Sequence, residues 1–246
     1  MFGNESANGV EHSRRVREMF GAIAGRYDLL NHLLSGNIDK RWRRLVARSV
    51  HESLSSRRSG ETKVLDVACG TGDLSLTLFD SGEAQIIGLD FCRPMLEIAR
   101  SKATNERAAL PFIEGDALQL PFSNETFDAV TIAFGLRNLA NVEAGVKELI
   151  RVLKPNGRLF VLEFSKPQTP ILRSLFQFYF TRVLPLFGGL ISGSRGAYEY
   201  LPDSVSHFPN QEELASIMAG AGLEEVDFQN LTGGIAALHI GKRPVN

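Results

Sequence analysis

Cysteine is scarce in this chain of 246 residues, which has two, Cys69 and Cys92. Two cysteines cannot build a disulfide framework or a four-cysteine zinc site, so a disulfide-stapled scaffold is excluded. Residues 1–15 lack the apolar core of a signal peptide, and we expect a reducing, cytoplasmic setting. The five histidines are scattered without metal-ligand spacing, and we expect no metal site.

Long apolar runs without charges are also missing. The most apolar stretch, residues 171–191, contains Arg173, Arg182 and Pro185. A membrane span needs about 20 mostly apolar residues, so we do not expect this stretch to cross a bilayer. Its apolar residues fall near helical spacing, which fits a core helix, the wall of an apolar pocket, or a face that lies on a membrane.

Net charge is nearly absent, at −1, but it is unevenly distributed. Residues 1–60 hold 11 Lys and Arg against 6 Asp and Glu, whereas the rest of the chain is acidic. A basic segment on an acidic body could face an anionic membrane, a nucleic acid or only water. The charge pattern alone leaves these alternatives open.

What the chain does have is an ordinary globular composition, with 43% hydrophobic and 22% charged residues. Short apolar runs rich in β-branched residues alternate with helical segments, as expected of strands buried on both faces. The runs cover residues 64–67, 86–89, 129–134 and 159–164, with a shorter candidate at 111–113. This alternation predicts an α/β fold with a mostly parallel sheet and helices on both faces.

The two ends of the chain read differently from this middle part. Residues 1–12 show no pattern of a regular element, and helical spacing begins at Ile38. Near the C-terminus, apolar runs at 223–230 and 235–241 flank Thr232-Gly233-Gly234, which predicts an antiparallel hairpin. With this hairpin the expected sheet has seven strands.

A glycine turn, Gly70-Thr71-Gly72, follows the first expected strand and opens a helix. Glycines there allow a ligand to approach the backbone, and free N–H groups at the helix start attract anionic groups. Asp66 precedes the turn, and Asp90 ends the second strand 20 residues after Gly70. A carboxylate at that position can accept hydrogen bonds from the ribose hydroxyls of an adenosine ligand.

Asp116-Ala117 follows the third strand, where an acid can accept from an adenine amino group. The several acids around the turn would repel a pyrophosphate, but they tolerate the ammonium and sulfonium of S-adenosylmethionine. Ser75 also replaces the third small residue of the dinucleotide fingerprint. The acids therefore favour the sulfonium cofactor over NAD.

The glycine turn and these acids resemble the cofactor site of class I S-adenosylmethionine-dependent methyltransferases. Further blocks resemble the C-methyltransferases of menaquinone and ubiquinone biosynthesis. They are Tyr27-Asp28-Leu-Leu-Asn31 with Trp42, Phe134-Gly-Leu-Arg137-Asn138, residues 151–157 and Leu162-Glu-Phe-Ser-Lys-Pro167. Asn156 replaces a glycine that is usual in this pattern, and asparagine tolerates a positive φ.

The resemblance implies a Rossmann-like methyltransferase domain over residues 61–246, a helical N-terminal lid over residues 1–60 and a substrate-side insertion at about 166–208. It implies that S-adenosylmethionine is the methyl donor. The residues it implies as cofactor contacts are Asp66, Gly70, Thr71, Gly72, Asp90, Asp116 and Ala117.

The resemblance also implies the reaction, which is transfer of a methyl group to a ring carbon of a prenylated hydroquinone. Demethylmenaquinol would become menaquinol; the equivalent step in ubiquinone biosynthesis and methylation of another small molecule are the alternatives. Arg137, Asn138 and Tyr27 are the expected catalytic residues. Arg137 would stabilise a developing phenolate, because a guanidinium stays protonated in proteins. Asn138 could form a hydrogen bond with the second ring oxygen.

The expected partner is this prenylated substrate, with peripheral contact to the inner face of a membrane and a homo-oligomeric state left open. Glu163 is left open between a partner of Arg137 and another buried, paired acid. Nucleic acid is not expected, because the fourth strand ends in Ala133-Phe-Gly-Leu-Arg137 rather than in the proline-rich turn used on flipped bases.

Overall fold

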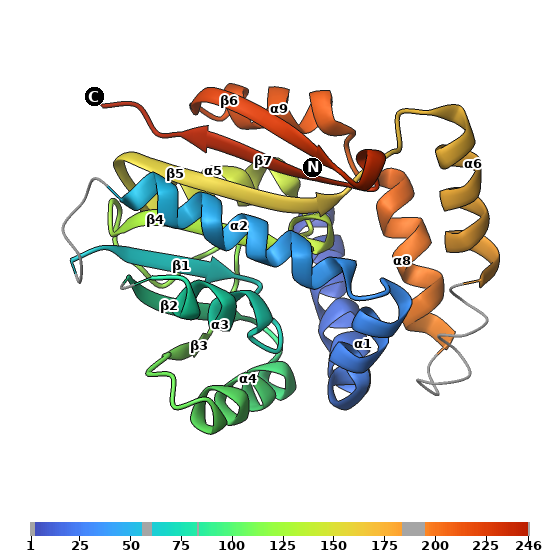
Figure 1. Ribbon diagram of the computed structural model, residues 1–246, viewed down its shortest axis with the longest axis horizontal. Coiled ribbons are helices and arrows are strands. Elements are labelled where there is room, and N and C mark those ends of the chain that lie inside the picture. Colours follow the sequence, from blue (N-terminus) through green and yellow to red (C-terminus); the bar gives the residue numbers. More distant parts are fainter. Residues whose placement is uncertain (1–2, 56–60, 83, 184–194, 246) are drawn as a thin grey trace.

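A computed structural model describes residues 3–55, 61–82, 84–183 and 195–245 of the chain. Strands in the described part form one sheet with the order β3-β2-β1-β4-β5-β7-β6 (Figure 1). Their bounds are β1 Lys63–Val67, β2 Gln85–Asp90, β3 Phe112–Glu114, β4 Phe127–Ala133, β5 Leu153–Phe164, β6 Glu224–Leu231 and β7 Ala236–Lys242. Strands β1 to β5 pair in parallel, whereas β7 runs antiparallel to both β5 and β6. The predicted α/β fold and its C-terminal hairpin are therefore confirmed.

Helices cover both faces of this sheet. The α-helices are α1 Gly3–Leu34, α2 Ile38–Leu54, α3 Asp73–Asp80, α4 Arg93–Asn105, α5 Val142–Val152, α6 Pro170–Phe178, α8 Arg195–His207 and α9 Gln211–Gly220. Short turns of other helix types are η1 Leu136–Asn138, η2 Tyr179–Val183 and η3 Thr232–Gly234. Apolar residues of α2 and α3 pack with one face of the central strands, and those of α5 and α9 pack with the other.

The local sequence explains where several elements begin and end. Helix α5 starts at Asn141, whose side chain accepts a hydrogen bond from the Ala144 N–H at 2.9 Å. The next strand turns sharply at Asn156, whose φ of 61° suits asparagine in a position where glycine is common. Asn210 and Glu213 form a capping box that starts α9.

Three helices gather beyond the carboxyl ends of the parallel strands, on the right in Figure 1. They are α1 from the N-terminus and α6 and α8 from the segment between β5 and α9. The expectation of no regular structure before residue 13 is wrong for the described residues, because α1 begins at Gly3. The division into a lid, a methyltransferase domain and an insertion stays a prediction.

The apolar stretch at 171–191 is described only as far as Val183, and its remainder lies outside the described residues. Its described part forms α6 and η2, so the helical spacing is confirmed there. Among the described residues, no helix combines the length and apolar character that crossing a bilayer requires.

Candidate active site

The glycine turn lies between β1 and α3, and its two glycines have different roles. Both have positive φ, 56° at Gly70 and 83° at Gly72. A Cβ at Gly72 would lie 3.0 Å from the Cβ of Ala99, so close packing against α4 requires glycine there. A Cβ at Gly70 would meet open space. Gly70 therefore leaves the backbone accessible to a ligand.

Asp90 ends β2 beside this turn and is almost fully buried. Its carboxylate accepts hydrogen bonds from the N–H groups of Gly70 and Cys92, each at 2.8 Å. Burial raises the pKa of the Asp90 carboxyl to about 6, although these N–H groups favour the charged form. The turn and the second strand are thus held together by a carboxylate that titrates near neutral pH.

A cavity opens at this point, beyond the carboxyl ends of the strands, with about 720 Å³ of empty space when the open solvent at its mouth is included. Gly70, Asp90, Asp116 and Ala117, all predicted from the sequence as cofactor contacts, line it together. The Asp116 carboxylate accepts a hydrogen bond from the Leu118 N–H at 2.9 Å, which fixes the loop after β3. The structure therefore gathers acids from two successive strand ends around one cavity, as ligand sites in such sheets require.

The other predicted cofactor contacts, Asp66, Thr71 and Gly72, do not line this cavity. Asp66 is buried, and its carboxylate accepts hydrogen bonds from the hydroxyls of Ser75 at 2.6 Å and Thr131 at 2.9 Å. Burial raises the pKa of Asp66 to about 6 as well. The Thr71 hydroxyl donates to Asp28 of α1. These residues support the turn, and their contact with a cofactor stays a prediction.

A second, larger cavity lies next to the first, with about 1150 Å³ of empty space when open solvent is included. Its wall contains eight aromatic residues, which are Phe20, Tyr27, Trp42, Phe134, Phe164, Phe176, Tyr179 and Tyr200. Phe20, Tyr27 and Phe134 also line the first cavity, so the two spaces share a wall. An apolar, aromatic cavity of this kind suits a flat ring with an apolar substituent.

Arg137 lies in η1, just after β4, and lines the second cavity. Its Nη1 donates to Glu163 Oε2 at 2.8 Å and to the Phe134 carbonyl at 2.6 Å. Glu163 Oε1 also accepts from the Arg137 backbone N–H at 3.2 Å. The Nε of Arg137 is buried without a hydrogen-bond partner among the described residues. Such an orphan donor is costly unless a ligand completes it.

Glu163, which the sequence left open, is therefore the buried partner of Arg137. Its side chain is 1% exposed. Asn138 lines the first cavity rather than the second, and its side chain makes two hydrogen bonds. Its Oδ1 accepts from the Tyr200 hydroxyl at 3.1 Å, and its Nδ2 donates to the Phe134 carbonyl at 3.2 Å. The predicted substrate contact of Asn138 stays a prediction.

Tyr27 of α1 is half-buried in the wall between the cavities. Burial raises the pKa of its phenol, although the nearby guanidiniums of Arg137 and Arg43 oppose the rise. Its hydroxyl therefore stays protonated at neutral pH and can donate a hydrogen bond. The sequence did not point to Tyr200 or Arg43, because these residues reach the cavity only through the placement of α8 and α2.

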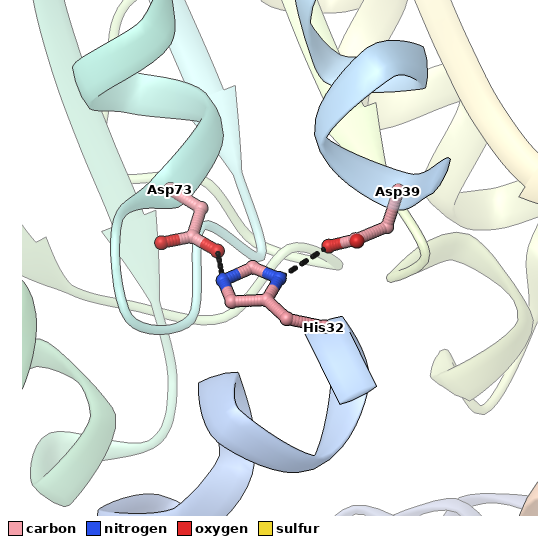
Figure 2. Close-up of side chains that lie close together, drawn as sticks. All are labelled: His32, Asp39 and Asp73. Atoms are coloured by element: carbon pink, nitrogen blue, oxygen red, sulfur yellow. Dashed lines mark hydrogen bonds and ion pairs between the residues drawn. The ribbon is translucent and has the colours of Figure 1, made fainter. Parts of the chain in front are cut away.

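Figure 2 shows one imidazole and two carboxylates, those of His32, Asp39 and Asp73, close together beside the glycine turn. Their spacing in the sequence did not indicate this cluster. The His32 Nδ1 lies 2.8 Å from Asp39 Oδ2, and the His32 Nε2 lies 3.4 Å from Asp73 Oδ2. These groups are close enough together to hold a metal ion. However, Arg43 already pairs with Asp39, and Lys102 pairs with Asp73 at 2.6 Å. The side chains of the protein thus balance these charges.

The sheet order and the cavity at its carboxyl edge define the fold of the S-adenosylmethionine-dependent methyltransferases. The structure matches the [4+2]-cyclase SpnF with a TM-score of 0.67 at 20% identity, covering 95% of this chain and 97% of that one. It matches an S-adenosylmethionine-dependent methyltransferase from Thermotoga maritima with a TM-score of 0.61 at 20% identity, covering 92% and 99%. At these identities the likeness concerns the fold alone.

The sequence narrows this class to one family. Residues 8–243 match the ubiE/COQ5 methyltransferase family, and the chain belongs to it. The demethylmenaquinone methyltransferase of Thermus thermophilus is 51% identical, with 92% of this chain and all of that protein covered. The protein of the same name from Deinococcus radiodurans is 44% identical, covering 95% and 94%. The ubiquinone/menaquinone biosynthesis C-methyltransferase UbiE of Geotalea uraniireducens is 42% identical, covering 95% and 98%.

Proposed function

We propose that this enzyme transfers a methyl group from S-adenosylmethionine to a ring carbon of demethylmenaquinol, which yields menaquinol. One observation carries the proposal: Arg137, whose buried Nε has no hydrogen-bond partner among the described residues, lines an aromatic cavity that shares a wall with the Asp90 cavity. Two of the relatives reported above are named demethylmenaquinone methyltransferases, and these names support a naphthoquinol substrate over a benzoquinol.

The first cavity suits the methyl donor. Asp90 would accept hydrogen bonds from the ribose hydroxyls, and Asp116 with Ala117 would hold the adenine. The open space at Gly70 leaves room for the methionyl part against the backbone. When bound there, S-adenosylmethionine supplies a methyl group made electrophilic by its sulfonium. S-Adenosylmethionine has no anionic phosphate that the acids of the site would repel.

The second cavity suits the hydroquinone. A ring carbon becomes a good nucleophile when the neighbouring hydroxyl loses its proton, because the phenolate pushes electron density onto the ortho carbon. Arg137 stabilises this phenolate by donating a charged hydrogen bond, as an oxyanion hole does. Arg137 is not suited to be the base, because a guanidinium stays protonated in proteins. As the new carbon–carbon bond forms, the bond between sulfur and the methyl carbon would break and S-adenosylhomocysteine would leave. The ring carbon would then lose its hydrogen as a proton to water, and aromaticity returns.

The protonated Tyr27 would donate a second hydrogen bond in the shared wall and help to bring ring carbon and methyl group into line. The aromatic walls exclude water, which strengthens both contacts. Peripheral contact with a membrane fits the same proposal, because a polyprenyl tail is insoluble in water and the outer face of α6 is apolar.

The replacement of Arg137 by Ala tests the proposal. We expect turnover of reduced demethylmenaquinone to fall by about 100-fold or more, since the loss of one oxyanion-hole donor costs about 10²- to 10³-fold in rate. Calorimetry with S-adenosylhomocysteine should give an unchanged affinity. Wild-type turnover in the variant would contradict the proposal. Loss of both turnover and S-adenosylhomocysteine binding would show that the substitution had damaged the fold.

A further inference from the structure

The second cavity has a second guanidinium, that of Arg43 on α2, in addition to Arg137. The Cζ of Arg43 lies 5.8 Å from the centroid of the Phe134 ring, and the Cζ of Arg137 lies 5.4 Å from the centroid of the Phe164 ring. The two rings are 4.8 Å apart. One pair of neighbouring aromatic rings in the cavity wall therefore has a guanidinium over each of its members.

Each guanidinium is paired with a buried carboxylate. Asp39, which is 4% exposed, pairs with Arg43, and Glu163, which is 1% exposed, pairs with Arg137. Each arginine can therefore donate hydrogen bonds into the cavity without adding an uncompensated charge to an apolar space. Arg43 has a hydrogen-bond partner among the described residues only for its Nη1, and its other N–H groups remain for a ligand.

The two guanidinium groups, those of Arg43 and Arg137, match a ring that has two oxygens. We propose that Arg43 binds the second ring oxygen of the hydroquinone while Arg137 binds the first, so that Arg43 is a specificity-determining residue of the site. This inference rests on the proposed function. It gives Arg43 the contact with the second ring oxygen that was expected of Asn138, because Asn138 lines the first cavity rather than the second.

A ring held at both oxygens has one orientation toward the methyl donor, whereas a ring held at one oxygen can turn about it. A site that hydrogen-bonds a hydroxyl also discriminates against a substrate that lacks it, because its donor is then left unpaired. The cavity should therefore select a hydroquinone over the matched monophenol.

The experiment compares two short-tailed substrates that dissolve in water. One is the reduced demethylnaphthoquinone, and the other lacks the hydroxyl farther from the methylated carbon. We expect the wild-type enzyme to prefer the hydroquinone by roughly 10- to 100-fold in kcat/KM, the size of a hydrogen bond to a charged group. The Arg43→Met variant should lose this preference, because kcat/KM falls for the hydroquinone and stays unchanged for the monophenol.

Arg43→Met also leaves Asp39 buried without its partner, so the double variant Asp39→Asn with Arg43→Met is the second test. It should lose the same preference while its affinity for S-adenosylhomocysteine stays at the wild-type value. Equal losses for both substrates in either folded variant would overturn the inference, and so would a wild-type enzyme without the preference. A wild-type enzyme that methylates neither substrate would overturn the proposed function itself.

Discussion

Glu163 fixes the position of Arg137 by bonding both its guanidinium and its backbone N–H. Glu163→Gln keeps the shape of the side chain and removes its charge. We expect kcat to fall by about 10- to 100-fold, since charge-assisted hydrogen bonds contribute roughly 1.5–3 kcal/mol. The affinity for S-adenosylhomocysteine should not change. Steady-state kinetics and calorimetry measure both quantities.

A buried acid far from the cavities provides the matched control for Glu163. Asp128 pairs with Lys154 at 2.8 Å near the other end of the sheet and lines neither cavity. Asp128→Asn should lower the free energy of unfolding and leave kcat unchanged. If Glu163→Gln also lowered the free energy of unfolding but left kcat unchanged, the positioning role of Glu163 would be wrong.

We expect Asp90 to make cofactor binding depend on pH. Burial raises its pKa to about 6, and ribose hydroxyls would bind the charged form, so a proton would compete with the cofactor. The affinity for S-adenosylhomocysteine should be constant above pH 7 and fall about tenfold per pH unit below pH 6, as linkage to one proton requires. Asp90→Asn should bind weakly with a flat profile. A variant that keeps the wild-type slope would assign the titration to another group.

Sequence reasoning found the acids of the first cavity because each one follows the end of an expected strand, and parallel strands bring their ends to one edge. Gly70, Asp90, Asp116 and Ala117 meet there as predicted. It did not find Arg43, because the spacing of Asp39 and Arg43 indicates only an ordinary helical ion pair. The function of this pair depends on how α2 is placed over the sheet.

At the scale of elements, two salt bridges join α1 to α3 beside the glycine turn. Lys102 of α4 bonds Asp28 of α1 and Asp73 of α3, both at 2.6 Å. Lys102→Met should loosen α1, and we expect faster chymotrypsin cleavage near Phe20 and Tyr27. Release of S-adenosylhomocysteine should also be about 3- to 10-fold faster, an effect of the order of 1 kcal/mol expected for a partly buried network.

Arg93→Met on the same helix is the control, because Arg93 forms an exposed pair with Glu97 at 3.6 Å. It should leave both cleavage and release at wild-type rates. Equal rates of cleavage and of release in the two variants would mean that these salt bridges do not hold α1 over the cavities.

The parallel strands could be predicted because they are continuous apolar runs, as strands buried on both faces are, and α5 because its apolar residues recur at helical spacing. The first turns of α1 could not, because residues 3–12 have no apolar period. Their contacts are tertiary: the His12 Nε2 lies 3.2 Å from the Asn138 carbonyl, and Gly9 packs near Ala140. Such contacts exist only after the sheet has formed, and a local pattern does not reveal them.

At the scale of the whole molecule, α6 connects the second cavity to the outside. Phe176 lines this cavity, whereas Ile171, Leu175 and Phe178 are 79%, 60% and 61% exposed. An apolar helix face of this kind binds the interface of a bilayer. We expect the double variant Leu175→Glu with Phe178→Glu to lose most binding to phospholipid vesicles and to keep its kcat on a short-tailed substrate.

Val245→Glu is the matched control, since Val245 is 65% exposed and directly precedes the last residue. The C-terminal end of the chain lies on the opposite side of the molecule from α6 (Figure 1). It should bind vesicles like the wild-type protein. Equal losses of binding in the control and in the double variant would mean that α6 has no special contact with the membrane.

The central claim is that a methyl group passes between two cavities that share the wall of Phe20, Tyr27 and Phe134. The most direct measurement incubates the purified enzyme with methyl-labelled S-adenosylmethionine and either reduced demethylmenaquinone or the demethyl benzoquinol. Mass spectrometry and NMR then locate the label. The account predicts a labelled methyl group on the free ring carbon of the naphthoquinol, beside the prenyl tail. A label on a ring oxygen, or no label on either quinol, would contradict it.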